Sequence, residues 1–497
     1  MATHHTIIVG AGMAGLAAAI ALSAKGESVT VVESRTYPGG KMRQIQTPGG
    51  GVDSGPTVFT MKYVFDELFD MAGRTVEQEL GLDRTNILAR HAWDDSGTFD
   101  LFTDRKESED AIARFFGKAN ADGYRRFCAD AENIFATLKD TYIGAQRPGP
   151  FELGRRVGLT RLPTLLALRP FTSLWNALGD YFPDARLQQL FGRYATYVGS
   201  SPFQSPATLM LIAHVEQEGV WFVEGGMHAL ARKMAEVAEG CGARFHWESP
   251  VAHILETKGR ASHVELQNGV RLEGDTILFC GDASALANGV LKSSRMSVVP
   301  VPRNKRALSA LTWSITANTG GVDLHRHNVF FSDAYKAEFD AIFKNSTTPA
   351  QPTVYVCAQD RQADGTLATQ NGERLLCLTN APAFGDEKRL TQEEMNRCED
   401  AMFSTLTKCG LQVDRASMKG TITQPADFEA LFPGSGGSLY GRAAHGWLAS
   451  FARSGAKTAI PGLYLAGGSV HPGPGVPMAT RSGMLAAEQI LKDRALT

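Results

Sequence analysis

Three glycines near the start of the chain have the spacing of a phosphate-binding loop. Gly10, Gly12 and Gly15 form a G-x-G-x-x-G pattern directly after the apolar run TIIV, and Glu33 ends the next apolar run. In such a strand–helix–strand unit the first glycine permits a tight turn, the second lets a phosphate approach the backbone, and the third lets the helix pack closely. Glu33 lies 18 residues after Gly15, where an acid accepts hydrogen bonds from ribose hydroxyls and repels a 2′-phosphate. The pattern predicts a dinucleotide site that disfavours NADP.

Glycine-rich stretches elsewhere in the chain decide which dinucleotide fits. PGGKM at 38–42 and SGPT at 54–57 follow soon after Glu33, although each taken alone is an ordinary turn sequence. Residues 461–491 repeat the order of strand, glycine-rich loop and helix near the other end of the chain. A molecule longer than NAD could reach from the first loop to this one. Its flavin ring would lie against residues 473–478, with the start of a helix near Met478 facing the anionic reduced form. The two distant loops therefore favour FAD over NAD.

Composition excludes several other classes of protein. The chain has 497 residues, too many for one hydrophobic core, so two or three domains are expected. A net charge of −2 gives no sign of nucleic-acid binding. The seven cysteines include no C-x-x-C pair, which argues against disulfides or a metal site and indicates a cytosolic protein. No apolar run reaches the ~18 residues of a spanning helix, so we expect a cytoplasmic protein, soluble or on a membrane surface.

Several motifs together resemble one family of enzymes. They are the glycine motif with Glu33, PGGKM, SGPTVFT, GVWFVEGGMHAL at 219–230, PADFEALFPGSGGSLYG at 425–441 and GLYLAGGSVHPGPGVPMA at 462–479. In this order, along nearly the whole chain, they resemble the bacterial carotenoid desaturases of the phytoene desaturase type. GGGVDSGPTVFTMKYVFDELF and GGSVHPGPGVPMAT are most similar to the hydroxycarotenoid 3,4-desaturases, or methoxyneurosporene dehydrogenases, of phototrophic bacteria. Lys41 departs from the pattern, since related flavoproteins commonly carry arginine there.

The resemblance implies an FAD-dependent oxidoreductase that acts on CH–CH bonds of acyclic carotenoids. It would introduce the C3,4 double bond into 1-hydroxy carotenes by hydride transfer to flavin N5 and loss of a proton. Quinone, oxygen or a redox partner would reoxidise the flavin. An all-trans phytoene desaturase is the nearest alternative, and a protoporphyrinogen or amine oxidase-like flavoenzyme would share the cofactor motifs. A protein resembling the Rab GDP-dissociation inhibitors would have this architecture without flavin, and the intact glycine motif argues against it.

The implied fold is α/β, with a Rossmann-like FAD-binding domain of the GR2 or amine-oxidase type and an interleaved α+β domain for substrate and membrane binding. The FAD domain would be discontinuous and comprise residues 1–65, 215–287 and 445–497. Residues 66–214 would form a mainly helical membrane and substrate domain, and residues 288–444 a β-rich substrate domain. Two local patterns are informative: Asn268–Gly269 is a hairpin turn sequence, and an apolar stripe of helical period from Tyr124 to Leu138 indicates core.

The motifs and the resemblance together assign residues to the site. Those expected to bind FAD are Gly10, Ala11, Gly12, Met13, Ala14, Gly15, Glu33, Ser34, Gly39, Gly40, Lys41, Met42, Gly55, Pro56, Thr57, Val251, Asp282, Gly467, Gly468, Gly475, Val476, Pro477 and Met478. Asp282 is equally well explained as the cap of the helix that follows it. Glu224 and His471 are the catalytic candidates by motif position, although a structural role explains each as well. A hydroxylated substrate also needs a buried polar partner, for which the candidates are His214, Glu216 and His228.

One segment has the composition of a membrane-binding surface. Residues 147–169 hold five arginines and one acid, with leucines, Phe151 and Val157 between them. The apolar side chains could enter the headgroup region while four arginines meet anionic lipid, namely Arg155, Arg156, Arg161 and Arg169. The alternative is solvated charge on an ordinary helical domain. Because a water-insoluble carotenoid must be loaded from the bilayer, we expect a peripheral protein on the inner or photosynthetic membrane.

Overall fold

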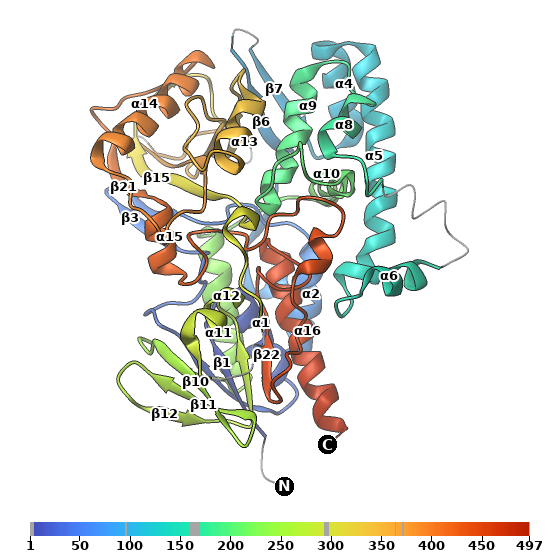
Figure 1. The fold of residues 1–497 in the computed structure, drawn as a ribbon. Helices are drawn as coiled ribbons and strands as arrows, with labels where there is room; N and C mark the ends of the chain where they lie inside the picture. The colour runs from blue at the N-terminus through green and yellow to red at the C-terminus, as the bar shows by residue number, and fades with distance from the viewer. Residues whose placement is uncertain are drawn as a thin grey trace.

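The molecule consists of two regions, each built on a separate sheet. The computed structural model describes residues 4–94, 97–158, 169–292, 298–362, 364–369 and 372–496. In Figure 1 the region at the bottom holds both ends of the chain. The chain crosses between the two regions several times, so each region is assembled from segments that are far apart in the sequence.

A five-stranded parallel sheet forms the centre of the lower region. In spatial order its strands are β22 (Leu463–Leu465), β13 (Thr276–Phe279), β1 (His5–Val9), β2 (Ser28–Val32) and β9 (Arg244–His246). One face packs against helices α1 (Met13–Ser23), α11 (Met227–Gly240) and α16 (Val476–Ala495). The other face packs against a four-stranded sheet of β12 (Arg271–Glu273), β11 (Arg260–Leu266), β10 (Val251–Thr257) and β14 (Leu291–Lys292). Cover on both faces explains why the central strands are nearly all apolar and buried.

A seven-stranded mixed sheet forms the centre of the upper region. In spatial order its strands are β21 (Lys419–Thr423), β15 (Ser309–Ala317), β19 (Glu373–Ala381), β18 (Val354–Ala358), β17 (His327–Phe330), β6 (Ile87–Ala92) and β7 (Thr98–Phe102). Strands β6 and β7 form an antiparallel hairpin, and β6 extends the later strands by pairing in parallel with β17. One sheet therefore draws on both segments, 66–214 and 288–444, that the sequence analysis assigns to substrate binding.

Helices cover this upper sheet in two groups. One apolar cluster joins β6 and β7 to α4 (Arg105–Phe116), α5 (Lys118–Leu138), α8 (Leu174–Gly179), α9 (Ala185–Gly192), α10 (Leu211–Glu218) and α13 (Tyr335–Phe343). A second cluster packs α14 (Gln392–Lys408) on β15, β18 and β19. The apolar stripe from Tyr124 to Leu138 is buried in α5, which confirms the prediction that it is core.

Other features named in the sequence analysis have clear outcomes. Gly269 N donates to the Leu266 carbonyl in the turn between β11 and β12, so the hairpin at Asn268–Gly269 is confirmed. All seven cysteines are free thiols. Among the described residues, no helix is long and apolar enough to cross a membrane. The same residues contain no group of three histidines, cysteines or carboxylates that could hold a metal ion.

Helices α1 and α16 approach each other so closely that only glycine fits at their contact. A Cβ added to Gly483 would lie 2.1 Å from the carbonyl oxygen of Ala14. Within α1, a Cβ added to Gly15 would lie 2.0 Å from the carbonyl oxygen of Gly10. Because β1 and β22 belong to one parallel sheet, the helices that follow them begin at the same sheet edge. The contact therefore packs two helices from opposite ends of the chain together, at the first turn of α1 and at Gly483, seven residues after the start of α16.

Substitution Gly483→Ala should lower the free energy of unfolding by about 1–3 kcal/mol, because the added methyl group overpacks the contact with α1. Gly179→Ala is the matched control, since Gly179 is an exposed glycine of α8 and a Cβ there would have no atom within 4 Å. Urea unfolding of both variants and the parent protein gives the measurement. A Gly483→Ala curve that overlies the parent curve would contradict the proposed constraint.

Candidate functional site

Two glycines of the first glycine loop, Gly12 and Gly15, differ in the space around them. Gly12 caps α1 in an extended conformation, and the nearest atom to an added Cβ would be Gly40 Cα at 4.0 Å. Gly15 has no such space, because the Gly10 carbonyl would lie 2.0 Å from its added Cβ. Gly12 is therefore where an anion can approach the N-terminal end of α1, and Gly15 serves close packing.

Glu33 is held at the end of β2 with its carboxylate turned toward this loop. Its Oε2 accepts a hydrogen bond from Ala11 N at 2.7 Å, and its Oε1 accepts from Arg35 N at 2.9 Å and from the Ser34 hydroxyl at 3.0 Å. The side chain is buried. A carboxylate offers about four lone-pair positions, so Glu33 keeps acceptor capacity for ribose hydroxyls beside the loop.

The PGGKM and SGPT segments pack against the first loop. Gly39 N donates to the Ala11 carbonyl at 2.8 Å. An added Cβ on Gly40 would lie 3.2 Å from Gly12 Cα, and one on Gly55 would lie 1.9 Å from the Lys41 carbonyl. The structure thus brings three of the predicted cofactor-binding segments together at one edge of the parallel sheet.

The C-terminal glycine loop reaches the same place from the other end of the chain. Gly467 N donates to Ser482 Oγ at 3.1 Å, and α16 begins at Val476, two residues before the expected start. Added Cβ atoms on Gly467, Gly468 and Gly475 would find their nearest atoms at 3.4, 3.6 and 3.7 Å, so the backbone is open there. The positive end of the α16 dipole faces this opening.

Lys41 supplies a deeply placed cation between the loops. Its Nζ donates to the Leu439 carbonyl at 2.7 Å, so its hydrogen bond goes to a neutral acceptor. Burial lowers the pKa of Lys41, an effect that the Asp282 carboxylate opposes. An ammonium group in this position can neutralise a diphosphate as a point charge, without the paired hydrogen bonds of an arginine.

Arg453 is a second buried cation at the same place, and no sequence motif predicted it. Its guanidinium, only 5% exposed, donates to the carbonyl oxygens of Tyr440, Arg442 and Gly468. Burial lowers the pKa of Arg453 to about 10. The one signal in the sequence is an isolated arginine within the small and apolar stretch LASFARSGA. Arg453 and Lys41 together give this place two positive charges near the one carboxylate of Asp282, which fits an anionic cofactor.

Asp282 has the capping role that the sequence left open, and it also faces the cations. Its Oδ1 accepts a hydrogen bond from Ser284 N at 2.9 Å at the start of α12 (Ala283–Ala285). The same carboxylate opposes the loss of charge on Lys41 and Arg453. Val251, the other residue that the resemblance assigned to the cofactor, is half-buried at the start of β10.

The two catalytic candidates lie in different surroundings. His471 is buried, its Nε2 lies 2.9 Å from the Ala145 carbonyl, and its ring packs edge-on against Tyr142. Burial lowers the pKa of His471 to about 4, so the ring is neutral at pH 7. Glu224 is exposed at the rim of a cleft of about 780 Å³ that Asp53 and Arg326 also line. Catalysis by either residue stays a prediction, and the contacts of His471 are those of a structural residue.

The three candidates for a hydroxyl partner are far from equivalent. His214 Nδ1 lies 2.9 Å from Arg105 of α4, and His228 Nε2 lies 3.0 Å from the Pro38 carbonyl. Glu216 is buried in the upper region, where its carboxylate accepts hydrogen bonds from two tyrosines, Tyr194 at 2.6 Å and Tyr197 at 2.7 Å. The acceptor capacity of Glu216 is therefore already partly used.

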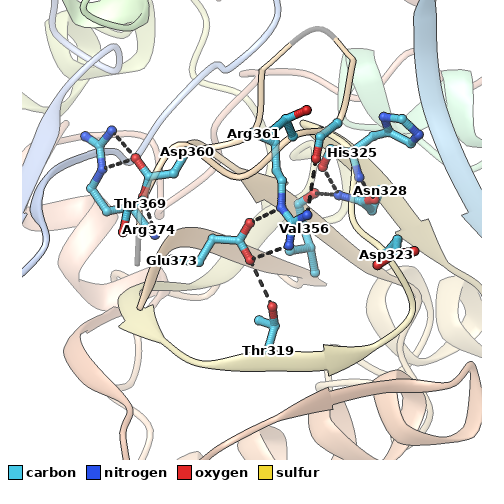
Figure 2. A network of polar contacts seen from close by, with 12 residues as sticks. Thr319, Asp323, His325, Asn328, Val356, Asp360, Arg361, Thr369, Glu373 and Arg374 are labelled. Atoms are coloured by element: carbon cyan, nitrogen blue, oxygen red, sulfur yellow. Dashed lines mark hydrogen bonds and ion pairs between the residues drawn. The ribbon is translucent and has the colours of Figure 1, made fainter. Parts of the chain in front are cut away.

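A polar network fixes the upper sheet to the hairpin that follows the PGGKM segment in the chain. Figure 2 shows Arg374 paired with Asp360, and Arg374 also donates to the Gly51 carbonyl at 2.7 Å in the hairpin β3 (Gln44–Thr47)–β4 (Gly50–Asp53). Beside it, Arg361 pairs with the buried Glu373, which accepts a further hydrogen bond from Thr319 at 2.9 Å. Because the hairpin lies between the PGGKM and SGPT segments in the chain, these contacts attach both segments to the upper sheet.

The segment expected to bind membrane uses part of its charge internally. Arg156 of α6 (Pro150–Val157) pairs with Glu152 and donates to the Thr141 and Gln146 carbonyls, and Arg169 pairs with Asp180. Both arginines are therefore held by the protein, which corrects the expectation that they are free for lipid. Arg155 is exposed, and Arg161 lies outside the described residues.

The site combines an open glycine loop on a βαβ unit, an acid for a ribose and a second glycine loop beside buried cations. These features define a Rossmann-like FAD-binding protein with an interleaved second domain. The chain belongs to the flavin-containing amine oxidoreductase family, which matches residues 13–491. It is thus a member of a family of flavin oxidoreductases, and its cofactor is FAD.

Similar proteins confirm the narrower resemblance. The chain is 47% identical to a hydroxyneurosporene desaturase of Rubrivivax gelatinosus, over 98% of this chain and 93% of that protein. It is 42% identical to a hydroxyneurosporene desaturase of Rhodobacter capsulatus, over 98% of both chains. Among solved structures, a redesigned putrescine oxidase superposes with a TM-score of 0.60 at 15% identity, over 99% of both chains. At that identity the structural likeness shows the fold alone.

Substitution Gly12→Val should remove most of the FAD from the purified protein and leave the unfolding transition of the FAD-free protein nearly unchanged. The reason is that the valine would fill the space above Gly12, where only Gly40 Cα lies as near as 4.0 Å to an added Cβ. Glu33→Ala should also lower FAD retention, because the ribose loses its acceptor. Flavin absorbance per polypeptide and thermal unfolding are the measurements, with the exposed Glu239→Ala as control. Full FAD retention in both variants would overturn the assignment of the site.

Proposed function

We propose that this chain is an FAD-dependent desaturase of acyclic carotenoids that introduces the C3,4 double bond into 1-hydroxy carotenes. The observation that carries the proposal is the full-length similarity to proteins named hydroxyneurosporene desaturases. An all-trans phytoene desaturase would share the fold and the cofactor, so the substrate is the point to test. A protoporphyrinogen or amine oxidase activity is the more remote alternative.

The interior of the upper region suits a long apolar substrate. Tyr197, Tyr355 and Tyr440 retain accessible surface although burial raises the pKa of each, in the case of Tyr440 to about 12. We propose that these side chains line the internal space that holds the substrate. Phe222 is also half-buried and packs edge-on near His327. Mostly aromatic walls of this kind bind hydrocarbon and exclude water.

Bound FAD supplies the hydride acceptor for the C–H bond that is oxidised. Loss of hydride from an allylic carbon leaves a cation that the polyene delocalises, and the neighbouring C–H bond becomes acidic enough to need no strong base. The chain must then align the substrate, exclude water and present aromatic faces to the cation. Reoxidation by quinone, oxygen or a redox partner completes the proposed cycle.

The test is to incubate holoenzyme with liposomes that carry equal amounts of a 1-hydroxy carotene and its unhydroxylated parent. The enzyme should convert the hydroxylated compound about 10-fold faster. A buried polar partner left unpaired by the parent is worth about that factor. Chromatography of the pigments, with mass and absorption spectra of the product, measures the ratio and locates the new double bond. Equal or faster conversion of the parent would instead assign the protein to the phytoene desaturases.

We also propose that the protein loads its substrate from an anionic membrane through an exposed apolar patch. The patch consists of Phe151, Phe171, Trp447 and Leu448, which are 80%, 75%, 42% and 49% exposed. The rings of Phe171 and Trp447 are in contact, with centroids 5.4 Å apart. The segment before α6 is tied to the segment after Leu448 through Arg147, which donates to the Phe451 carbonyl. Exposed aromatic groups gathered in this way are typical of interaction surfaces.

The double substitution Phe171→Ser and Trp447→Ser should lower partition onto anionic liposomes about 10-fold or more, because two large apolar groups no longer enter the bilayer. Arg155→Glu should cause a smaller loss that added salt abolishes. Val299→Ser is the control, since Val299 is a 72% exposed apolar residue elsewhere on the surface. Co-sedimentation is the measurement, and unchanged binding of the double variant would contradict the proposal.

A further inference from the structure

A chain of three polar side chains lies in the interior of the upper region, near Arg193 and Arg326. Thr57 Oγ1 is 2.7 Å from Tyr355 Oη, and Tyr355 Oη is 2.8 Å from His327 Nδ1. Thr57 follows the SGPT glycine, Tyr355 lies on β18 and His327 on β17. Thr57 is also one of the residues expected to bind FAD, whereas Tyr355 and His327 have no role in the cofactor site or the reaction described above.

The protonation of His327 sets the direction of these hydrogen bonds. Burial, aided by Arg326 and Arg193, lowers the pKa of His327 to about 3, so the ring is neutral and carries one proton. Its Nε2 is buried without a hydrogen-bond partner among the described residues. A buried N–H left unpaired costs more than an unused lone pair, so the proton resides on Nδ1.

Each donor then points along the chain toward Thr57. Nδ1–H of His327 donates to Tyr355 Oη, the Tyr355 hydroxyl donates to Thr57 Oγ1, and the Thr57 hydroxyl keeps its proton for another acceptor. The Cys357 thiol is within hydrogen-bonding reach of Thr57, but sulfur is a weak acceptor. Thr57 and Tyr355 are both half-buried, so the spare donor borders the internal space.

The position of this donor matches the proposed reaction. In a 1-oxygenated carotene the oxygen on C1 is three bonds from C3, which at ~1.5 Å per bond places it within about 4 Å of the carbon to be oxidised. A partner for that oxygen must therefore lie beside the flavin-binding loops. Thr57 is two residues after Gly55 of those loops, whereas His214 contacts Arg105 of α4 and Glu216 already binds two tyrosines.

We propose that Thr57, oriented by Tyr355 and His327, binds the C1 oxygen of the substrate and selects oxygenated over hydrocarbon termini. The proposal rests on the proposed function. Because Thr57 offers a donor, the ligand oxygen has only to accept, so a tertiary alcohol and its methyl ether both fit. A hydrocarbon terminus leaves the Thr57 hydroxyl with the weak thiol alone.

The test is competition between a 1-hydroxy carotene and its unhydroxylated parent, with holoenzyme and liposomes. Thr57→Val should lower the preference for the hydroxylated compound about 10-fold, and Thr57→Ser should retain most of it. Tyr355→Phe should lower the preference about 3-fold or more, because the Thr57 hydroxyl loses its orienting donor. Thr137→Val is the matched control, since Thr137 is half-buried on α5, as Thr57 is in its own place, and its hydroxyl donates to the Asn133 carbonyl.

A second readout separates binding from turnover. Under anaerobic conditions without an electron acceptor, the ratio of the two carotenes retained by each variant should change in the same direction as the conversion ratio. FAD content is recorded for each variant, and if Thr57→Val loses FAD, Tyr355→Phe decides the question.

The outcomes distinguish this proposal from the proposed function. If the unsubstituted protein shows no preference for the hydroxylated carotene, the proposed function fails, and the inference fails with it. If the unsubstituted protein prefers the hydroxylated carotene and both Thr57→Val and Tyr355→Phe keep the full preference, the proposed function stands. In that case only the role of Thr57 is refuted.

Discussion

The close approach of α1 and α16 is the constraint on which the site depends. With Gly483 against the Ala14 carbonyl and Gly15 against that of Gly10, neither contact admits a side chain. Helix α16 can therefore lie nearly backbone to backbone against the first turn of α1, and both helices, from opposite ends of the chain, begin at one edge of the parallel sheet. Only in that arrangement can open backbone at Gly12 and at Gly468 serve a single extended cofactor. The glycines thus act in two ways. Some permit the close packing that positions the loops, and others leave space for the cofactor between those loops.

A second constraint holds the substrate region in register with the cofactor loops. The hairpin β3–β4 lies between two cofactor-binding segments in the chain, packs against the upper sheet and makes polar contacts with it. Gln359 binds the backbone of Asp53 in both directions, the Ser54 and Ser314 hydroxyls are 2.7 Å apart, and Arg374 binds the Gly51 carbonyl. Thr57 follows directly on this hairpin, so its position relative to β18 is fixed by the same contacts. Hydride transfer needs alignment of reacting atoms above all, and a braced interface provides it without a moving element.

Local features could be predicted from the sequence because their causes are local. The βαβ unit, the hairpin at Asn268–Gly269 and the core stripe of α5 follow from periodicity and turn chemistry within a few residues. Partners across the chain could not be predicted in this way. Thr57 and Tyr355 are 298 residues apart, and nothing in the spacing of either indicates the other. For the same reason Arg453 was missed, and Arg156 was expected to face lipid although it binds carbonyls of its own domain.

The distribution of charge divides the interior into two parts with different chemistry. At the cofactor end, Lys41 and Arg453 are bound mainly by neutral carbonyl groups, and the start of α16 adds the positive end of its dipole. At the substrate end, the buried carboxylate of Glu216 is balanced by Arg193 through Tyr197, and His327 stays neutral because burial lowers its pKa to about 3. Negative charge is therefore favoured where the electron pair arrives. At the end from which it departs, Arg193 and Arg326 already lie over the rings of Tyr197 and Phe222, 5.1 and 4.5 Å from their centroids. The faces of these two rings are therefore engaged by fixed cations, and the charge that favours hydride transfer is that of the cofactor end.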